Sequence, residues 1–285
     1  EEKINTSVLG VIPYFHLDIE DEDSLTERFR KKSRSGLAKI AVIRLPRISN
    51  FTDIAPLEAV DELDVSYVSN ISQFGDPDVV IIPGSKNTIS DLLWMRQNGL
   101  EGKILRHAAK GGIVFGICGG YQMLGQSISD PTGAEQKGTV RGMGLLPVTT
   151  VFEQEKRRTR VSGRFAKVGG ALAEMSGVCY EGYEIHMGRT VLSKGTVPLV
   201  YMEEEGEQRQ DGAQSDHVYG CYMHGIFDMS ETVKTFLAAV LRKKGIDPSK
   251  ITVRDRNAYK EEQYDRLASI VRENLNMEAV YKIIE

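Results

Sequence analysis

Short apolar runs alternate with helical segments in the first half of the chain, and this alternation limits the folds that the chain can adopt. The runs AKIAVIRLP (38–46), DVVIIPG (78–84) and IVFGIC (113–118) are apolar at nearly every position, and TDIAPLEAVDEL (52–63) has helical spacing. A strand that is apolar on both faces is typical of a parallel sheet covered by helices on both sides. We therefore predict an α/β fold with a mostly parallel central sheet flanked by helices.

The pattern changes on either side of this region. Short strands and turns are expected from about 140 to 225, and two amphipathic helical segments follow Ser230. Before the alternation begins, SVLGVIPYF (7–15) predicts a short buried strand, and the charged stretch after it predicts a linker that ends near Gly36. We predict three parts: 1–37, a main domain over 38–245, and a helical extension over 246–285.

Composition excludes some classes of protein. The formal net charge of -4 gives no reason to expect a nucleic-acid partner. No apolar run approaches the roughly 20 residues that a membrane-spanning helix needs, so we expect no membrane association. The three cysteines, Cys118, Cys179 and Cys221, are widely spaced and form no metal-ligand cluster. A metal-free protein in a reducing cytoplasm is the simplest interpretation.

One cysteine stands in a distinctive setting. GGIVFGICGGYQMLG (111–125) places Cys118 between an apolar strand and the start of a helix, with Gly116 and Gly120 two residues away on either side. A nucleophile elbow has this layout, because its sharp turn needs neighbouring positions without a Cβ atom. The first amides of the helix point at the sulfur, and the helix dipole favours a thiolate. On these residues alone Cys118 is either a nucleophile or a small buried residue in a tight turn.

A nucleophilic cysteine needs a base and a group that stabilises an oxyanion. His224 in VYGCYMHGIFD is the preferred base, since it follows a strand-like run and precedes a glycine; His186 is the rival, and the other three histidines are assigned structural or surface roles. Gly84 ends a buried strand, so its amide and that of Gly119 are expected to form a two-donor oxyanion hole. An ordinary turn at Gly84 is the alternative.

Taken together, GICGGYQ after a strand, an upstream Pro-Gly and a late histidine resemble the class I, or triad, glutamine amidotransferases, which have a flavodoxin-like fold. Longer stretches resemble the C-terminal half of the cobyric acid synthase family, and PGSKNT replaces the usual Pro-Gly-Gly. The opening VLGVIPYFHLDIEDEDSL (8–25) is similar to the tail of that family's synthetase domain. The longer stretches are AVIRLPRISNFTDIAPL (41–57), PGSKNTISDLLWMRQNGL (83–100), GYEIHMGRT (182–190) and YMHGIFD (222–228).

The resemblance implies a mechanism and a set of partners. Cys118 would attack the side-chain amide of glutamine, His224 would move the protons, and Gln122 would help to hold the substrate. Glu184, in GYEIHMG, would line the glutamine pocket or pack under it. The ammonia released on hydrolysis of a γ-glutamyl thioester would amidate the b, d, e and g carboxylates of adenosylcobyrinic acid a,c-diamide, in the biosynthesis of cobalamin.

Two departures from the family pattern matter. The triad class usually carries a glutamate two residues after the histidine, and Ile226 stands there, as in the cobyric acid synthase branch. Asp228 and Glu184 are the candidates to orient the imidazole instead. The chain also has no GxxxxGK[ST] phosphate loop. We therefore expect ATP and Mg²⁺ to bind a synthetase domain that precedes this segment in a longer protein, and this chain alone to make no cobyric acid.

Two other functions stay open at this stage. One is an amidotransferase for another acceptor, such as cobyrinic acid or a cell-wall precursor, and the other is a non-catalytic binding module with the same fold. The basic run EQEKRRTR (153–160) is expected to be a solvated turn, with a contact to the corrinoid or the synthetase domain as the alternative.

Overall fold

The computed structural model describes residues 7–15, 17, 36–204, 207–250 and 256–284. The chain forms two compact units, a large one over 29–253 and a small one that combines 1–28 with 254–285. The two terminal stretches, which the sequence pattern assigns to separate parts, thus belong to one unit. The predicted linker falls almost wholly outside the described residues.

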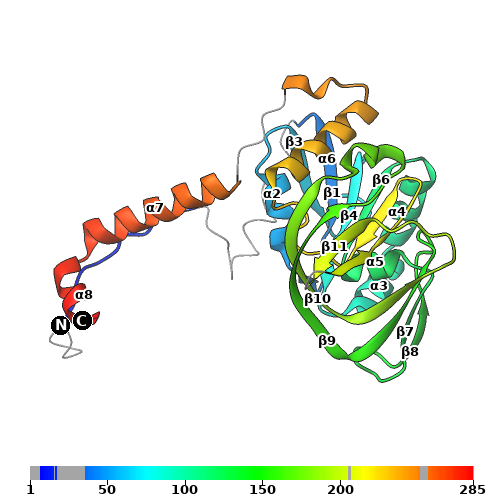
Figure 1. Ribbon diagram of the computed structural model, residues 1–285, viewed down its shortest axis with the longest axis horizontal. Coiled ribbons are helices and arrows are strands. Elements are labelled where there is room, and N and C mark those ends of the chain that lie inside the picture. Colours follow the sequence, from blue (N-terminus) through cyan, green and yellow to red (C-terminus); the bar gives the residue numbers. More distant parts are fainter. Residues whose placement is uncertain (1–6, 16, 18–35, 205–206, 251–255, 285) are drawn as a thin grey trace. The chain divides into compact units, whose positions relative to one another are not determined.

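A six-stranded sheet forms the centre of the large unit (Figure 1). Every pair of neighbouring strands is parallel except β13–β14. All residues of β4 and β6 are buried, and five of the six in β1 are buried, as both faces of this sheet are covered. The predicted α/β class is confirmed. In spatial order the strands are β13 (Ala213–Ser215), β14 (Val218–Cys221), β6 (Ile113–Ile117), β4 (Val79–Ile82), β1 (Ala38–Ile43) and β3 (Leu63–Val68).

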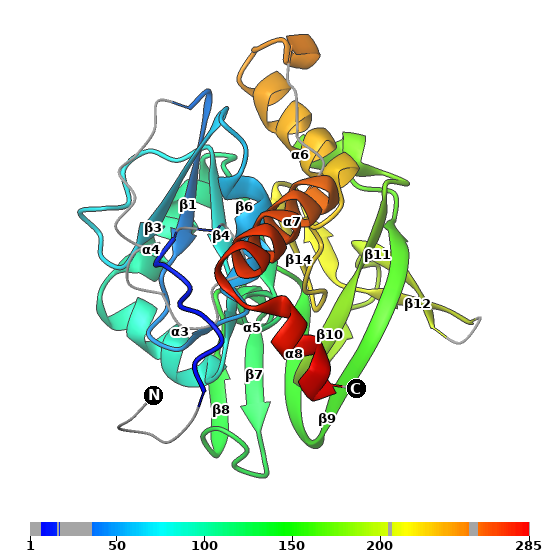
Figure 2. The same cartoon turned by 90° about the vertical axis from the view of Figure 1, so that its left-hand side faces the viewer.

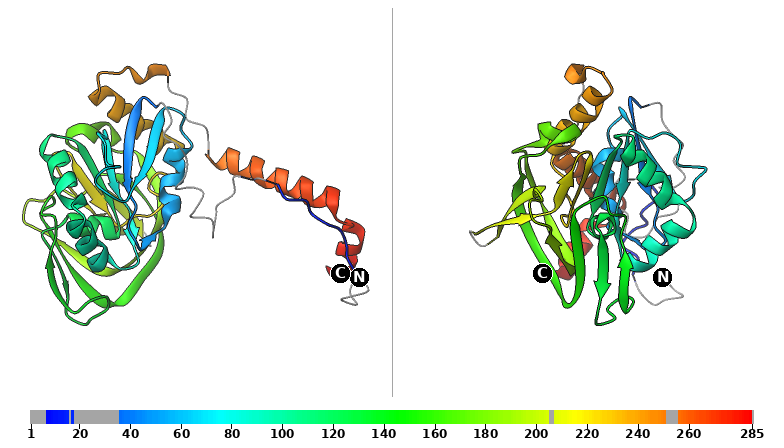
Figure 3. Two further views of the ribbon diagram at one scale, coloured as in Figure 1. Left: turned by 180° about the vertical axis from the view of Figure 1, so that it is seen from behind. Right: turned by 90° about the vertical axis from the view of Figure 1, so that its right-hand side faces the viewer.

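A second sheet lies beside the first, and Figures 2 and 3 show it on the side opposite to α3 and α4. Its long antiparallel pair β9–β10 is interrupted by an irregularity between His186 and Gly188. The basic run 153–160 lies inside β9, so the expectation of a solvated turn is wrong; the strand continues because β10 pairs with it on both sides of the irregularity. The strands are β12 (Glu207–Asp211), β11 (Val200–Glu204), β9 (Val148–Phe165), β7 (Ser127–Asp130) and β8 (Gly138–Arg141), with β10 (Cys179–Leu192) on β9.

Helices and a short ribbon complete the large unit. The predicted helix over 52–63 is much shorter than expected, since only η1 and α2 form there. The elements are η1 (Phe51–Ile54), α2 (Ala55–Glu58), α3 (Thr88–Gln97), α4 (Leu100–Ala109), α5 (Gly119–Leu124), η2 (Gly170–Met175), α6 (Ser230–Lys243), η3 (Pro248–Lys250) and the two-stranded ribbon of β2 (Ile48–Ser49) and β5 (Gly84–Ser85).

The small unit joins the two ends of the chain. Its helices are α7 (Arg256–Asn274) and α8 (Met277–Ile284). Gly10 forms an isolated antiparallel bridge with Leu275, and the amide of Asn276 donates a hydrogen bond of 2.7 Å to the carbonyl of Leu9. The predicted strand over 7–15 is therefore limited to this one bridge.

None of the helices within the described residues combines the length and the apolar character that crossing a membrane requires.

Candidate active site

Residues that follow four strands of the central sheet lie at one edge of that sheet. Cys118 follows β6, Gly84 follows β4, His224 follows β14, and Asp53 lies in the 3-10 turn after β1. These strands are consecutive in the sheet order β14-β6-β4-β1. Because the carboxyl ends of parallel strands open on the same edge, residues far apart in the sequence meet there.

Cys118 has the strained backbone of a strand-to-helix elbow. Its φ of 52° and ψ of -107° are unusual for a residue with a side chain. The turn is anchored by the hydrogen bond of 2.9 Å from its amide to the carbonyl of Cys221, and its thiol lies 3.6 Å from the carbonyl oxygen of Ile185. A Cβ atom at Gly120 would lie 1.9 Å from the carbonyl oxygen of Ile82, so α5 can start here only with glycine. The thiol is mostly covered, with Cys118 7% exposed.

His224 and Asp53 form a buried pair next to this cysteine. The Nδ1–H of His224 donates to Oδ2 of Asp53 over 2.7 Å, and the amide of Gly225 donates to Oδ1 over 2.9 Å. Burial of the ring opposes its charge, but the Asp53 carboxylate and the Cys118 thiol outweigh this and raise the pKa of His224 to about 10. With Nδ1 held by Asp53, Nε2 is the nitrogen left for proton transfer.

The two candidates for orienting His224 are wrong, because Asp53 occupies that position. Tyr183 stacks on the His224 ring with centroids 5.3 Å apart, and the next residue of the strand, Glu184, points to the opposite face of β10. The Asp228 carboxylate instead lies beside the tight turn at Gly225, where a Cβ atom would be 2.8 Å from its Oδ2.

The two predicted oxyanion donors come together at the same edge. A Cβ atom on Gly84 would lie 3.1 Å from Cε1 of His224 and 2.9 Å from Oγ of Ser49. A Cβ atom on Gly119 would lie 3.0 Å from the amide nitrogen of Ser85. The segment after β4 and the start of α5 are therefore in close approach, and a side chain at either position would be tightly packed. An oxyanion hole formed by Gly84 and Gly119 stays a prediction that fits this geometry.

Gln122, one turn after Cys118, is held at both ends of its amide. Its Oε1 accepts a hydrogen bond of 3.2 Å from Oγ1 of Thr88, and its Nε2 donates one of 3.1 Å to the hydroxyl of Tyr222. A Cβ atom on Gly188 would come within 2.4 Å of Nε2, so β10 passes very close to this amide. The amide of Gln122 is thus fixed by protein groups on both sides, and its role in holding glutamine stays a prediction from the resemblance.

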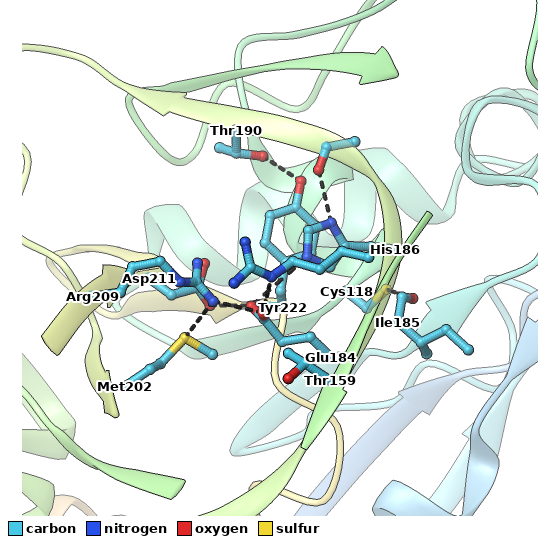
Figure 4. Close-up of polar contacts among 12 residues, drawn as sticks. Cys118, Thr159, Glu184, Ile185, His186, Thr190, Met202, Arg209, Asp211 and Tyr222 are labelled. Carbon is cyan, nitrogen blue, oxygen red and sulfur yellow. Dashed lines mark hydrogen bonds and ion pairs between the residues drawn. The ribbon is translucent and has the colours of Figure 1, made fainter. Parts of the chain in front are cut away.

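The rival histidine, His186, supports Tyr222 rather than Cys118. Its ring is stacked on that of Tyr222 (Figure 4). The two ring centroids are 3.7 Å apart, and the ring planes differ by 13°. Its Nδ1 donates to the carbonyl of Gly188 over 2.8 Å. The Tyr222 hydroxyl is also 2.6 Å from Oγ1 of Thr190. His186 therefore packs against the tyrosine whose hydroxyl accepts the hydrogen bond from Gln122.

Glu184 lies next to His186 and is fully buried among basic groups (Figure 4). Its carboxylate is 2.6 Å from Nη2 of Arg209, 3.0 Å from Nε of Arg157 and 3.7 Å from Nε2 of His186. Burial alone would raise the pKa of Glu184, but His186 and Arg209 lower it to about 2. A cavity of about 370 Å³ borders this cluster, lined among others by Arg157, His186, Arg209 and Tyr222. Glu184 is therefore ionised and lies beside His186, which supports the Tyr222 side chain that contacts Gln122.

Asp53, Thr88 and Tyr222 are members of the site that the sequence pattern did not identify. The signal for Asp53 was present, since an acidic residue in a turn after a parallel strand belongs at the active edge. Thr88 is likewise a polar residue that follows the carboxyl end of a parallel strand, here β4. Tyr222 lies two residues before His224 and gave no signal that separates it from a core aromatic residue.

Comparisons with known proteins agree with this geometry. Residues 39–232 match the CobB/CobQ-like glutamine amidotransferase domain. A cobyric acid synthase from Ruminiclostridium cellulolyticum is 53% identical over 99% of this chain and 56% of its own length. One from Lachnoclostridium phytofermentans is 44% identical over 99% of this chain and 56% of its own length. The chain thus spans about half the length of the curated relatives it matches.

Solved structures support the fold alone. PurLQS from Thermotoga maritima superposes with a TM-score of 0.54 at 17% identity, over 73% of this chain and 99% of that one. A crystal structure of a glutamine amidotransferase gives a TM-score of 0.51 at 16% identity, over the same shares of the two chains. With a cysteine elbow, a buried histidine–carboxylate pair and a family match over two thirds of its residues, the chain belongs to the CobB/CobQ-like glutamine amidotransferase family.

Proposed function

We propose that this chain is the glutamine-hydrolysing portion of a cobyric acid synthase. The single observation that carries the proposal is the meeting of Cys118, His224 and Asp53 at the carboxyl edge of the sheet. The high identity to proteins named cobyric acid synthase supports the choice of enzyme within the family.

The first half of the reaction releases ammonia. The positively charged His224 ring favours a thiolate on Cys118, which attacks the carbonyl carbon of the glutamine side-chain amide. The oxyanion that forms is stabilised by amides at Gly84 and Gly119. His224 then gives its Nε2 proton to the departing nitrogen, the carbon–nitrogen bond breaks, and a γ-glutamyl thioester remains on the sulfur.

The second half regenerates the enzyme. Neutral His224 takes a proton from water, and the hydroxide so formed attacks the thioester carbonyl. The carbon–sulfur bond breaks, glutamate leaves, and the thiolate and the charged ring are restored. The sum is glutamine plus water to glutamate plus ammonia. Asp53 accepts the hydrogen bond from Nδ1–H throughout and so fixes the tautomer and orientation of the ring, as an orienting group in a triad does.

The use of the ammonia belongs to the whole enzyme. We propose that a synthetase portion, which binds ATP and Mg²⁺, activates the b, d, e and g carboxylates of adenosylcobyrinic acid a,c-diamide for amidation. A cytoplasmic location is part of the same proposal. It is consistent with the three cysteines being free thiols, as expected in a reducing compartment.

Labelling with diazo-oxonorleucine, a glutamine-like electrophile, tests the proposed nucleophile. One label should attach to Cys118, added glutamine should slow the labelling, and Cys118→Ala should abolish it. The matched control is Cys179→Ala, which removes an exposed thiol and should leave the stoichiometry unchanged. Labelling at Cys179, or labelling that survives Cys118→Ala, would refute the assignment.

The acceptor needs a separate test with the full-length enzyme. Given glutamine, ATP, Mg²⁺ and adenosylcobyrinic acid a,c-diamide, the enzyme should convert four carboxylates to amides, as counted by mass spectrometry of the corrinoid. Glutamine hydrolysis without any corrinoid amide would keep the glutaminase and reject this acceptor.

A further inference from the structure

Exposed apolar side chains are concentrated in the small unit. Among the residues that the structure describes, twelve large hydrophobic side chains are exposed, and eight of these belong to this unit, although it contributes only 1–28 and 254–285. They are Val8, Val11, Ile12, Tyr14, Tyr264, Tyr281, Ile283 and Ile284. A monomeric soluble protein rarely leaves so much apolar surface in so small a part of the chain, so this surface is expected to be covered.

Helix α8 has the clearest unburied apolar face. Met277, Val280, Tyr281 and Ile284 follow the i, i+3, i+4, i+7 spacing that places side chains on one side of a helix. The opposite side carries the ion pair between Lys282 and Glu278, with 2.7 Å between the charged atoms. None of the residues of α8 is buried, and Ile284 is 75% exposed. An amphipathic helix of two turns is marginal in water without a partner for its apolar face.

The segment 7–15 shares this surface. Val11 is 77% exposed and Ile12 is 42% exposed. The bridge from Gly10 to Leu275 fixes this segment to the connection between α7 and α8, and a Cβ atom at Gly10 would collide with the backbone of Asn274. Whatever covers α8 is therefore close to Val11 and Ile12 as well.

We propose that this apolar surface is the docking site for the synthetase portion of the full-length enzyme. The argument for this occupant is length, because the chain spans only 56–58% of three curated relatives that it matches, so their remaining residues must pack somewhere. The inference rests on the proposed function for the identity of the occupant. The small unit would then connect the portion that hydrolyses glutamine to the portion that carries out amidation.

Hydrogen–deuterium exchange followed by mass spectrometry tests the docking site directly. The probe is the peptide that contains 277–284, compared between the 285-residue chain and the full-length enzyme. Amide exchange in this peptide should be at least tenfold slower in the full-length enzyme. Equal exchange in the two proteins would overturn the proposal.

Paired variants of the full-length enzyme sharpen this test. The double variant Ile283→Lys, Ile284→Lys should return exchange of the peptide to within about twofold of the 285-residue chain, since it places two charges in the interface. The matched control is Ile71→Lys, Val197→Lys, which changes two side chains of similar chemistry that are 49% and 47% exposed on the large unit. The control should retain the slow exchange; loss of protection in both, or in neither, would overturn the assignment of the site.

Other occupants give different results. If the 285-residue chain alone shows slow exchange and sediments as a dimer, a second copy covers the surface and the proposal is overturned. Slow exchange in the monomeric chain assigns the surface to the large unit and likewise overturns it. Labelling of Cys118 by diazo-oxonorleucine is measured in parallel: its absence, with protection retained, would reject the proposed function and leave the docking site standing.

Discussion

Asp53→Asn is the perturbation that most directly tests how the site works. The substitution keeps the shape of the side chain and removes its charge. The amide oxygen of asparagine can still accept the Gly225 amide, which leaves its NH₂ group facing Nδ1 of His224. Two donors cannot share that contact, so the ring must carry its proton on Nε2 instead. In this tautomer Nε2 cannot take a proton from Cys118 or from water.

The size of the effect follows from the pKa of His224. The pKa rises from 6.5 to about 10, and this shift corresponds to roughly 5 kcal/mol between the charged and neutral rings. Asp53 supplies only part of it, because the Cys118 thiol also favours the charged ring. We therefore expect Asp53→Asn to lower kcat/KM for glutamine hydrolysis by about 10²–10³-fold, or ~3–4 kcal/mol. This loss is smaller than the roughly 5 kcal/mol that corresponds to the whole pKa shift.

The same pair makes stability depend on pH. The folded pKa of His224 is raised above its unfolded value, so its contribution to stability is complete below pH 6.5 and is lost as the pH rises through about 10. The free energy of unfolding of the wild-type protein should fall across this window, and Asp53→Asn should flatten the dependence. Urea unfolding at either end of the window measures both slopes.

Release of glutamate in a coupled dehydrogenase assay measures the catalytic effect, and Asp228→Asn is the matched control. Asp228 is also an aspartate close to Gly225, whereas the carboxylate that holds Nδ1 of His224 is that of Asp53. Its variant should stay within about fivefold of wild type. If Asp53→Asn stays within that range while Asp228→Asn fails, then the structural assignment is wrong and the sequence-based candidate is right.

Three further changes probe the parts around this pair. Tyr222→Phe removes the hydroxyl that holds the Gln122 amide, so KM for glutamine should rise about tenfold while kcat changes little, as steady-state kinetics would reveal. Glu184→Gln should lower the free energy of unfolding by about 3 kcal/mol at neutral pH, because it removes the buried negative charge that pairs with the partly exposed Arg157 and Arg209. The pKa of Glu184 is about 2 in the folded protein, so the wild-type advantage is present above the unfolded pKa of 4.5 and disappears on acidification through about 2, as urea unfolding across that range would detect. Gly120→Ala should cost at least about 2 kcal/mol through its clash with a sheet carbonyl, whereas Gly102→Ala, in an open helical position, should stabilise by about 0.5–1 kcal/mol in the same unfolding assay.

Local features of this protein were predictable from its sequence because their causes are local. The strands of the central sheet are buried on both faces, so each appears as an unbroken apolar run. The elbow at Cys118 is specified by neighbouring glycines, and one of them, Gly120, has no room for a Cβ atom. The prediction of a helix over 52–63 was wrong in its length, because helical spacing does not indicate where tertiary contacts end a helix. Only Ala55–Glu58 forms an α-helix there.

Long-range pairing is the part that a single sequence could not supply. Asp53 and His224 are 171 residues apart, and their contact depends on β1 and β14 both ending at the edge where β6 presents the cysteine. Since the carboxyl ends of parallel strands meet at one edge of the sheet, any polar residue in the turn after β1 was a candidate to orient His224. Choosing among these residues requires the strand order. Glu184 shows the complementary difficulty. It lies on the correct strand, but Tyr183 faces His224, and the alternation of strand side chains turns Glu184 toward Arg157 and Arg209 instead. A shift of one residue in the register of β10 would exchange these two roles, so the identity of the orienting carboxylate depends on a register that the sequence does not state.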